Sequence, residues 1–430
     1  MTTNPRRLVE RRYLVPFILI TSLFALWGFA NAITNPLVAA FKDIMNISTA
    51  QASMVQFAFY GGYATMALPA ALFIRRYSYK SGILLGLGLY AIGAFLFIPA
   101  AAFEQFSFFC ISLYVLTFGL AFLETTANPY ILSLGSKETS TRRLNFAQAF
   151  NPVGSLTGMG VASFIILPNL ISDERDASGQ LIHTTLTSAE RAHDLAVIRD
   201  PYVAIGLVVL IMFIIIAIAK MPRVQNDENK IDFRHTLARL WQNKPYRWGV
   251  VAQVFYVAAQ IMVWTFIIQY ADALGISKAT AQTYNIVAMG LALSFRFIGT
   301  YLMKYIRPAR LLTAFGIGAM GCTAATILIH GIAGLYFLVA ISAFMSIMFP
   351  SIYGIALEKV EETDTSLGAA FLVMAIVGGA LMPPLQGMII DCGTIGWLPA
   401  VNVSFVLPLG CFTIVTLYAL YILRRRRNLK

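Results

Sequence analysis

Long apolar runs, most of them near twenty residues, limit what this chain can fold into. A helix that crosses a bilayer needs about twenty apolar residues, whereas a membrane-spanning strand needs about ten. The composition agrees, because 58% of the 430 residues are hydrophobic and only 12% are charged. The mean hydropathy is +0.72. We therefore predict an all-α membrane protein and not a water-soluble globular one.

The alternation of apolar runs with polar breaks predicts twelve transmembrane helices. They cover residues 14–40, 52–74, 81–102, 106–134, 145–170, 202–221, 247–272, 280–303, 309–329, 333–357, 366–390 and 397–423. The basic N-terminus and first apolar run resemble a cleavable signal peptide. The apolar character continues past Pro36, however, so we expect a first span there.

Lys and Arg are distributed unevenly between the two sides of the membrane. One side, which holds both termini, carries 26 of the 32 basic residues. The opposite loops carry Lys42, Arg175, Arg191, Arg199 and Lys278, and Arg296 lies inside a span. The positive-inside rule predicts that both termini are cytoplasmic. The net charge of +12 is explained by this pattern and does not indicate nucleic-acid binding.

Two hydrophilic segments interrupt the pattern of spans. Ser172 to Asp200 carries mixed charge and is expected to be an external surface loop. Pro222 to Tyr246 is basic, and it separates the first six spans from the last six. We predict an N-terminal bundle over 1–221, a cytoplasmic linker over 222–246 and a C-terminal bundle over 247–430. This organisation is typical of the major facilitator architecture, in which substrate binds between two bundles.

Glu124 is a lone carboxylate within the apolar run of the fourth span. It lies roughly ten residues from the nearer end, about 15 Å along a helix, which is too deep for easy snorkelling. Such a residue faces a bundle interior or a wet cavity, and it often relays protons. Asn128 shares its helical face. The alternative is a static hydrogen-bond network between helices.

Amide side chains follow one face of the first and fifth spans. Asn31 and Asn35 are four residues apart, with Thr34 beside them. The fifth span carries Asn145, Gln148 and Asn151 at three-residue spacing. Paired donors and acceptors suit the hydroxyls of a neutral sugar. Polar residues that hold helices together are the alternative for each of them.

The second half of the chain is more aromatic. The seventh span has a stripe of Gln253, Tyr256, Gln260 and Trp264, and Asn285 follows in the eighth span. Aromatic faces can stack on a sugar, although such stripes are more often packing. Arg296 is expected to snorkel to the cytoplasmic surface. Asp272 and Asp391 are expected to be solvated charges at external helix ends.

Motifs of enzyme chemistry are missing from the sequence. The four cysteines have no metal or redox spacing, and the four histidines form no HExxH pair. We find no Walker loop and no GxSxG elbow. We therefore expect no enzymatic activity, no metal, no cofactor and no transport powered by ATP. The expected partners are a small neutral sugar, protons and the lipid bilayer, with the chain acting as a monomer.

Five stretches resemble the L-fucose:proton symporter family of the major facilitator superfamily. They are Leu123–Pro129, Arg143–Asn151 and Tyr77–Gly82, with Ser22–Trp27 and Phe344–Ile347 in support. The resemblance implies a bacterial inner-membrane sugar symporter whose substrates are sugars such as L-fucose, glucose or galactose. It also implies that Glu124 matches the family's proton-linked glutamate, and that Gln148 and Asn151 match its sugar-contacting amides.

The chain departs from this family in its first span. The family usually has an aspartate there, whereas residues 31–35 read Asn-Ala-Ile-Thr-Asn. Three explanations are open: coupling through Glu124 alone, a facilitator without coupling, or a sequence altered at Ala32 or Asn35.

The sequence therefore predicts a proton-coupled monosaccharide symporter that works by alternating access. The alternatives in the same fold are an uncoupled sugar facilitator, a glucose/galactose transporter and a drug exporter. In a different class, the chain would be a membrane enzyme or a sugar sensor without transport. The predicted substrate-binding residues are Asn31, Asn35, Asn128, Gln148, Asn151, Gln260 and Trp264, with Glu124 as the proton-coupling residue.

Overall fold

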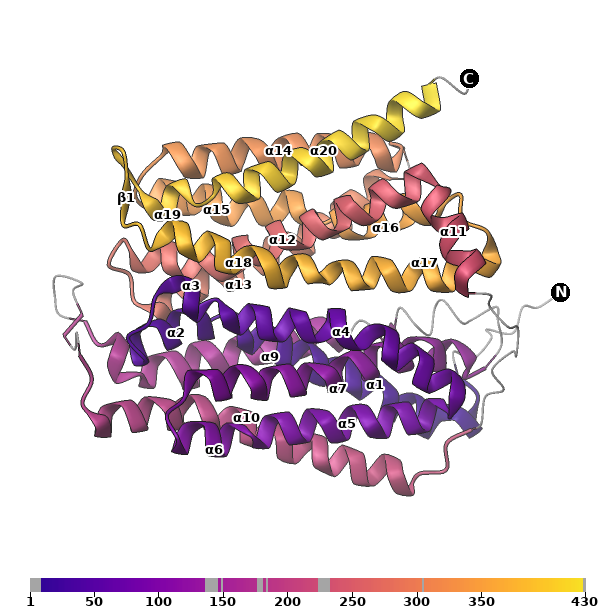
Figure 1. Cartoon of the computed structure of the whole chain (residues 1–430), viewed down its shortest axis with the longest axis horizontal. Helices are drawn as coiled ribbons and strands as arrows, with labels where there is room; N and C mark the ends of the chain where they lie inside the picture. The colour runs from indigo at the N-terminus through magenta and orange to yellow at the C-terminus, as the bar shows by residue number, and fades with distance from the viewer. Residues whose placement is uncertain are drawn as a thin grey trace. The chain divides into compact units, whose positions relative to one another are not determined.

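A computed structural model describes residues 9–135, 146–147, 150–175, 181–182, 185–222, 233–303 and 305–427. Helices dominate these residues (Figure 1). The strands β1 (Thr394–Ile395) and β2 (Leu398–Pro399) form a small antiparallel hairpin, with Thr394 opposite Pro399 and Ile395 opposite Leu398. The predicted all-α class is confirmed.

Six long helices correspond to the first six predicted spans. They are α1 (Leu14–Thr34), α4 (Met54–Arg76), α5 (Tyr79–Phe95), α7 (Phe106–Ser133), α9 (Phe150–Val161) and α10 (Ser188–Ile218). Short helices join or extend them: η1 (Arg11–Tyr13), α2 (Leu37–Ile44), α3 (Thr49–Ala52), α6 (Phe97–Ala102), η3 (Ala162–Ile166), η4 (Leu167–Asn169) and η5 (Ile171–Asp173).

The second half of the chain opens with a short helix, α11 (Phe233–Gln242), inside the predicted linker. The spans that follow are α12 (Lys244–Asp272), α13 (Lys278–Leu302), α14 (Pro308–Leu328), α15 (Ile332–Met345) with α16 (Met348–Leu357), α17 (Glu362–Met374) with η6 (Ala375–Val377) and α18 (Gly378–Ile390), and α19 (Ala400–Val403) with α20 (Val406–Arg427).

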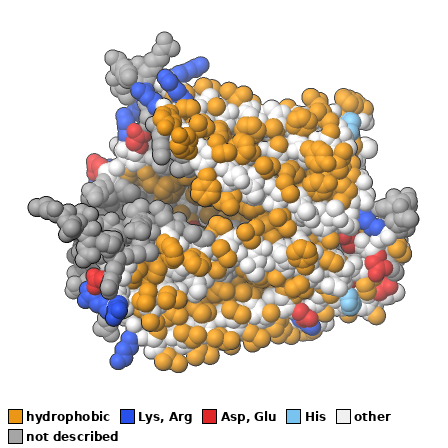
Figure 2. All heavy atoms as spheres, turned by 180° about the vertical axis from the view of Figure 1, so that it is seen from behind, with side chains coloured by type: hydrophobic (Ala, Val, Ile, Leu, Met, Phe, Trp, Pro, Cys, Tyr) orange, Lys and Arg blue, Asp and Glu red, His pale blue; other side chains and the backbone are white. Residues whose placement is uncertain are grey.

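Eleven helical segments among the described residues are long and apolar enough to cross a membrane. The helix α13 coincides with the remaining predicted span, 280–303. Figure 2 shows hydrophobic side chains over most of one face, with charged side chains gathered toward two opposite edges. This distribution fits a protein whose middle is surrounded by lipid.

Two compact units make up the chain. The first contains Met1–Asn35, Thr65–Ile171 and Thr187–Glu228, and the second contains Pro36–Ala64, Ser172–Leu186 and Asn229–Lys430. The second unit thus includes two segments from the first half of the sequence. The division into bundles 1–221 and 247–430 stays a prediction.

The external loop predicted over Ser172–Asp200 is wrong from Ser188 onward, because α10 begins there. Thr187 caps this helix: its hydroxyl accepts from the Glu190 backbone N–H, and the Glu190 carboxylate accepts from the Thr187 backbone N–H. This capping box was legible in the sequence. Ser172 and Asp173 are also buried and not surface residues.

The first predicted span, 14–40, is divided into two helices. The helix α1 ends at Thr34, and α2 begins at Leu37 after Pro36. Proline lacks a backbone N–H and disfavours helical geometry in the residue before it, so a break at Asn35 and Pro36 is the expected consequence.

Glycines allow the helices of the first unit to approach closely. A Cβ at Gly28 of α1 would overlap the carbonyl oxygen of Asn151 in α9, and a Cβ at Gly154 would overlap the carbonyl of Ala25. A glycine also lets α5 approach α7 closely, because a Cβ at Gly93 would overlap the backbone of Leu116. Figure 1 shows α5 and α7 running side by side. Small residues are the usual contact points of membrane helices, because lipid supplies little drive for association.

We expect Gly154→Ala to destabilise the protein, because its methyl group has no space beside the Ala25 carbonyl. Overpacking of this kind costs about 1–3 kcal/mol. Gly160→Ala in the same apolar stretch is the matched control, since nothing lies within 4 Å of its added Cβ. Thermal unfolding of both variants in detergent checks this. Equal transition temperatures would contradict the packing described.

Candidate functional site

Glu124 lies on α7, with its side chain only partly exposed. Its Oε2 atom is buried, and it has no hydrogen-bond partner among the described residues. Removing a carboxylate from water without a partner costs several kcal/mol, so such a group favours binding a proton or a ligand that supplies donors. The position of Glu124 in the sequence predicts a carboxylate inside the bundle, and one of its oxygens is indeed buried without a hydrogen-bond partner among the described residues.

The polar neighbours of Glu124 on α7 bond to their own helix. Asn128 Nδ2 donates to the backbone carbonyl of Glu124 at 3.1 Å, and Thr125 Oγ1 donates to the carbonyl of Ala121 at 2.7 Å. Thr126 Oγ1 donates to the carbonyl of Phe122 at 2.5 Å. These contacts satisfy donors within α7, and none of them is to Glu124 Oε2.

The amides of α1 lie at its C-terminal end, where the helix stops. Asn31 is partly buried, and Asn35 has 6% of its surface exposed. Between them, Thr34 Oγ1 lies 3.3 Å from the hydroxyl of Tyr202 in α10. Ala32 is buried on the α9 side, since a Cβ at Gly158 would lie 3.2 Å from the Ala32 methyl group. The nonpolar residue of this turn thus packs against α9.

Asn151 begins the contact between α9 and α1. Its Nδ2 atom donates to the carbonyl of Phe24 at 3.3 Å, and Ser155 Oγ donates to the carbonyl of Gly28 at 3.2 Å. Asn151 therefore has a helix-joining role, which the sequence left open beside sugar contact. The other predicted amide of this span, Gln148, lies outside the described residues, as does Asn145.

Gln260 and Trp264 lie on α12 in the second unit, and both are partly exposed. Trp264 Nε1 donates to Ser342 Oγ of α15 at 3.1 Å, and Asn285 Nδ2 of α13 donates to the Trp264 carbonyl at 3.0 Å. Two neighbouring helices therefore hold Trp264, a residue that is partly exposed. This arrangement suits an aromatic platform held in place by its surroundings.

Two further amides on α12 are buried without partners among the described residues. Both side-chain atoms of Gln253 and both of Gln269 lack hydrogen bonds, and these residues are 0% and 4% exposed. The sequence placed Gln253 on the polar stripe but gave no reason to single out Gln269. By contrast, the Tyr256 hydroxyl donates to the Met345 carbonyl at 3.1 Å, which is a packing role.

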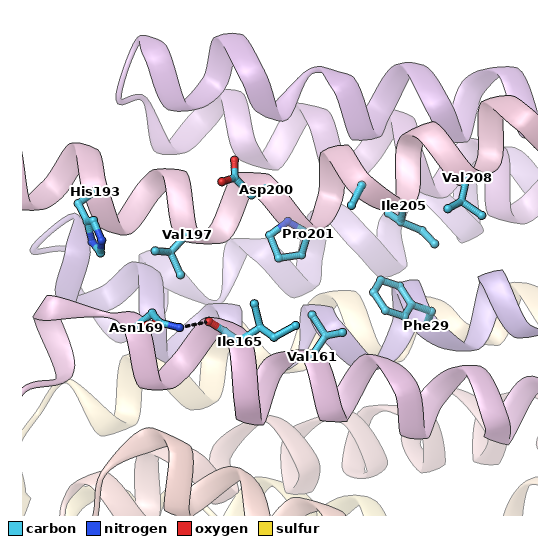
Figure 3. A pocket seen from close by; sticks show the side chains of 11 residues that line it. Phe29, Val161, Ile165, Asn169, His193, Val197, Asp200, Pro201, Ile205 and Val208 are labelled. Carbon is cyan, nitrogen blue, oxygen red and sulfur yellow. Dashed lines mark hydrogen bonds between the residues drawn. The ribbon is translucent and has the colours of Figure 1, made fainter.

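A pocket of about 590 Å³ lies in the first unit, and none of the predicted site residues lines it (Figure 3). Its walls come from α1, α9, η3, η4 and α10, and they are largely apolar. The lining residues are Phe29, Val161, Ile165, Asn169, His193, Val197, Asp200, Pro201, Ala204, Ile205 and Val208. Asn169 Nδ2 already donates to the Ile165 carbonyl at 2.8 Å. The pocket therefore offers few polar groups to pair with the hydroxyls of a sugar, and it does not suit one as a ligand.

The expectation of a solvated charge at an external helix end is wrong for Asp272, which is partly buried, whereas Asp391 is exposed as expected and also accepts backbone hydrogen bonds. Asp272 forms ion pairs with Arg175 and Lys278. Asp391 accepts the backbone N–H groups of Thr49 and Ala50 at 2.7 and 2.9 Å, at the start of α3. Burial acts to raise the pKa of Asp391. The hydrogen bonds from the two N–H groups outweigh this effect, so the pKa lies below its ordinary value.

Arg296 was expected to snorkel to the cytoplasmic surface, but its side chain also forms a hydrogen bond within the protein. Its Nε atom donates to the carbonyl of Ser346 at 3.1 Å, which joins α13 to the end of α15. The side chain is partly exposed, so lipid or water reaches only part of it.

A family model described as Major Facilitator Superfamily matches residues 19–383. This chain belongs to that superfamily. The members of the family and the relatives named below are transporters and not enzymes.

Curated relatives cover nearly the whole chain. An L-fucose-proton symporter of Haemophilus influenzae is 61% identical over 417 residues, covering 96% of this chain and 97% of the relative. An L-fucose-proton symporter of Escherichia coli is 33% identical, covering 95% and 93%. A glucose/galactose transporter of Brucella abortus is 31% identical, covering 96% and 95%.

Solved structures agree with this assignment. The crystal structure of the transporter FucP in the outward conformation is 32% identical, covers 96% of this chain and 99% of that one, and has a TM-score of 0.69. A bacterial homologue of the human lysosomal transporter Spinster, inward-facing and unoccupied, has a TM-score of 0.72 at 12% identity, with 96% and 98% covered. The second likeness concerns the fold alone.

Proposed function

We propose that this chain is a proton-coupled symporter of L-fucose or of a closely similar neutral monosaccharide. The observation that carries the proposal is the 61% identity, over nearly the full length of both chains, to an L-fucose-proton symporter. The spare carboxylate oxygen of Glu124 supports it, because a transporter that couples to protons needs a titratable group that leaves water.

In this proposal, Glu124 carries the proton and the amides contact the sugar. A protonated Glu124 lowers the cost of burying the site while the protein changes conformation. Asn31, Asn35, Asn128, Gln148 and Asn151 supply donors and acceptors from the N-terminal bundle, 1–221. Gln260 and Trp264 contribute from the C-terminal bundle, 247–430.

The protein lies in the bacterial inner membrane as a monomer, with both termini cytoplasmic. The excess of Lys and Arg on the side of the termini supports this orientation. An uncoupled facilitator is the second candidate, and the absence of an acidic residue from positions 31–35 favours it. A glucose or galactose substrate is supported by the relatives near 31% identity.

The test of this function is uptake into proteoliposomes that contain the purified protein, with and without an inward proton gradient. L-fucose, glucose, galactose and mannose are compared. We expect accumulation of L-fucose above its outside concentration only when the gradient is present. Equilibration without accumulation would identify a facilitator, and accumulation of a different sugar would correct the substrate.

We expect Glu124→Gln to abolish gradient-driven accumulation, because the amide keeps the shape of the side chain but cannot exchange a proton. Exchange of labelled for unlabelled sugar should continue, since it needs no net proton movement. Glu104→Gln is the matched control: this glutamate is in a long, partly exposed ion pair with Arg191 at 4.0 Å. Accumulation that survives in the Glu124 variant would exclude its role as the proton carrier.

We also expect Asn35→Asp to increase proton-driven accumulation if the first span has lost an acidic group. The substitution is nearly isosteric at a position where the side chain is 6% exposed. Ala32→Asp makes the useful comparison, because Ala32 is buried beside Gly158 and a carboxylate there would lose its hydration. It should instead lower thermal stability. No gain in uptake by the Asn35 variant would indicate that coupling needs no second acid.

A further inference from the structure

The pocket of about 590 Å³ described above lies within the first compact unit and reaches its surface. Ile165 and Val208, which line it, are 53% and 45% exposed, and Ala204 is exposed as well. Its wall α10 has other exposed apolar side chains, such as Ile211 and Ile214. Among the candidate spans of the described residues, α10 has the smallest buried share, 22%. The pocket therefore faces lipid, and we call it the α10 groove.

Irregular backbone occurs on both walls of the α10 groove. On one wall, the fifth span changes from α-helix to the π-helical segment η3 and then to the 3-10 turn η4. On the other wall, Pro201 lies inside α10 and has no N–H, so the carbonyl of Val197 cannot accept the usual helical hydrogen bond. Neither wall is a regular α-helix at this point, and regular ridge-into-groove packing cannot close the space between them.

The α10 groove has a polar end and an apolar end. His193 and Asn169 lie at the same end, which is the end nearer to the loop between the fifth and sixth spans (Figure 3). Asp200 comes next along α10. From Pro201 to Val208, every residue of α10 that lines the groove is apolar. Walls that change from polar to apolar along one direction suit an amphipathic ligand.

The length of the apolar part matches one leaflet of a bilayer. Asp200 and Val208 are eight positions apart on α10, which corresponds to about 12 Å along the helix. The hydrocarbon core of a bilayer is about 30 Å thick, so one leaflet contributes about 15 Å. An acyl chain of one leaflet can therefore follow the apolar part of the groove while its headgroup lies at the polar end. By the distribution of Lys and Arg, this is the leaflet on the side predicted to be external.

The polar end of the groove carries charges of both signs. Arg199 Nε and Nη2 lie 2.8 and 2.6 Å from Asp200 Oδ1, and the two side chains are 34% and 64% exposed. An exposed ion pair of this kind contributes little to stability, so its members can exchange partners at low cost. A phosphate suits the Arg199 guanidinium, and an ammonium group suits the Asp200 carboxylate. A zwitterionic headgroup supplies both.

His193 is held in place at the same end. Its Nδ1 atom lies 3.3 Å from Asp194 Oδ1, and Asp194 is completely buried. The same carboxylate oxygen accepts the backbone N–H of Ile171 at 2.9 Å, which joins α10 to η5. The His193 side chain itself stays 52% exposed. The polar end therefore presents a ring that is fixed from behind and accessible to a headgroup.

The apolar walls favour an acyl chain over the other molecules that could fill the space. Figure 3 shows Val197 and Ile205 of α10 pointing toward Ile165 and Val161 across the groove. Cavities with such walls do not hold water. An empty groove would deprive each of these side chains of dispersion contacts on one side. A chain of methylene groups restores those contacts and brings no polar group that needs a partner.

We propose that the α10 groove is a binding site for one phospholipid of the external leaflet. An acyl chain lies between α10 and the fifth span, and a zwitterionic headgroup lies at His193, Arg199 and Asp200. None of the predicted sugar-binding residues lines this site. The proposal does not depend on which sugar is carried or on proton coupling.

The test uses the full chain in proteoliposomes with a trace of phosphatidylethanolamine that carries a diazirine in one acyl chain. The vesicles are illuminated without any sugar, and the cross-linked residues are mapped by mass spectrometry. We expect Ile165 to be cross-linked about fivefold or more above Ile211 and Ile214, because a bound chain stays longer than the surrounding lipid. These three isoleucines are matched, at 53%, 56% and 50% exposed. Equal cross-linking of all three would overturn the site.

Filling the groove should displace the chain. We expect Ala204→Trp to lower cross-linking of Ile165 to the level of Ile211, since the indole occupies the space of the chain. Ala217→Trp is the matched control, because Ala217 is an exposed alanine of α10 outside the groove and should leave Ile165 unchanged. If gel filtration in detergent shows that Ala204→Trp does not fold, Val208→Trp fills the apolar end instead.

The filled variants also decide between lipid and other occupants. Unchanged cross-linking of Ile165 in a folded filled variant would overturn the proposal. Protection of Ile165 from the probe in the unmodified chain, together with a dimer in gel filtration, would overturn it too, because a second copy of the chain would then cover the groove.

The headgroup is tested with phosphatidylglycerol that carries the same photoreactive chain but no ammonium group. We expect it to cross-link Ile165 less than the phosphatidylethanolamine probe does. In Asp200→Asn this order should reverse, because Arg199 then faces the headgroup without a neighbouring carboxylate. Equal cross-linking by both probes in the unmodified chain would overturn the assignment of the headgroup to this end.

Discussion

A bilayer offers no hydrogen bonds to the backbone or to side chains, so each polar group that leaves water has to be satisfied within the protein. Helices meet this requirement for the backbone and leave only side chains to be accounted for. Close contact between helices then depends on small residues, as at Gly154, where α9 touches the carbonyl of Ala25. Polar side chains between such closely packed helices can find partners at few positions. Where they lie therefore indicates which of them have a structural role and which have a functional one.

Glu124 and Lys278 meet the same constraint in opposite ways. The Glu124 carboxylate keeps a buried oxygen without a partner among the described residues, which is costly unless a proton or ligand arrives. Lys278 is surrounded by three carboxylates and has its backbone N–H bonded as well. The first arrangement is suited to gaining and losing a proton, and the second to holding distant segments of the chain together.

The span pattern, the fold and the burial of a Glu124 carboxylate oxygen could be predicted from the sequence, because a bilayer sets helix length and penalises a lone acid. The role of Glu124 in proton coupling stays a prediction. The partners of Asp272 and Asp391 could not, since hydropathy does not show which distant loops meet. Asp391 and Ala50 are 341 residues apart, for example. The helical start at Ser188 was missed for a different reason: the charged first turns of α10 extend beyond its apolar run.

The first span contains no charged side chain, which limits the residues that can carry a proton in the first half of the chain. Between Arg12 and Lys42 the sequence contains no charged residue, so the turn from Asn31 to Asn35 offers no carboxylate for proton exchange. Asp43, which follows directly, is already paired with Lys278. If protons drive this protein, a carboxylate that is buried and still has an unsatisfied oxygen is required, and Glu124 is the residue of the fourth span that meets both conditions.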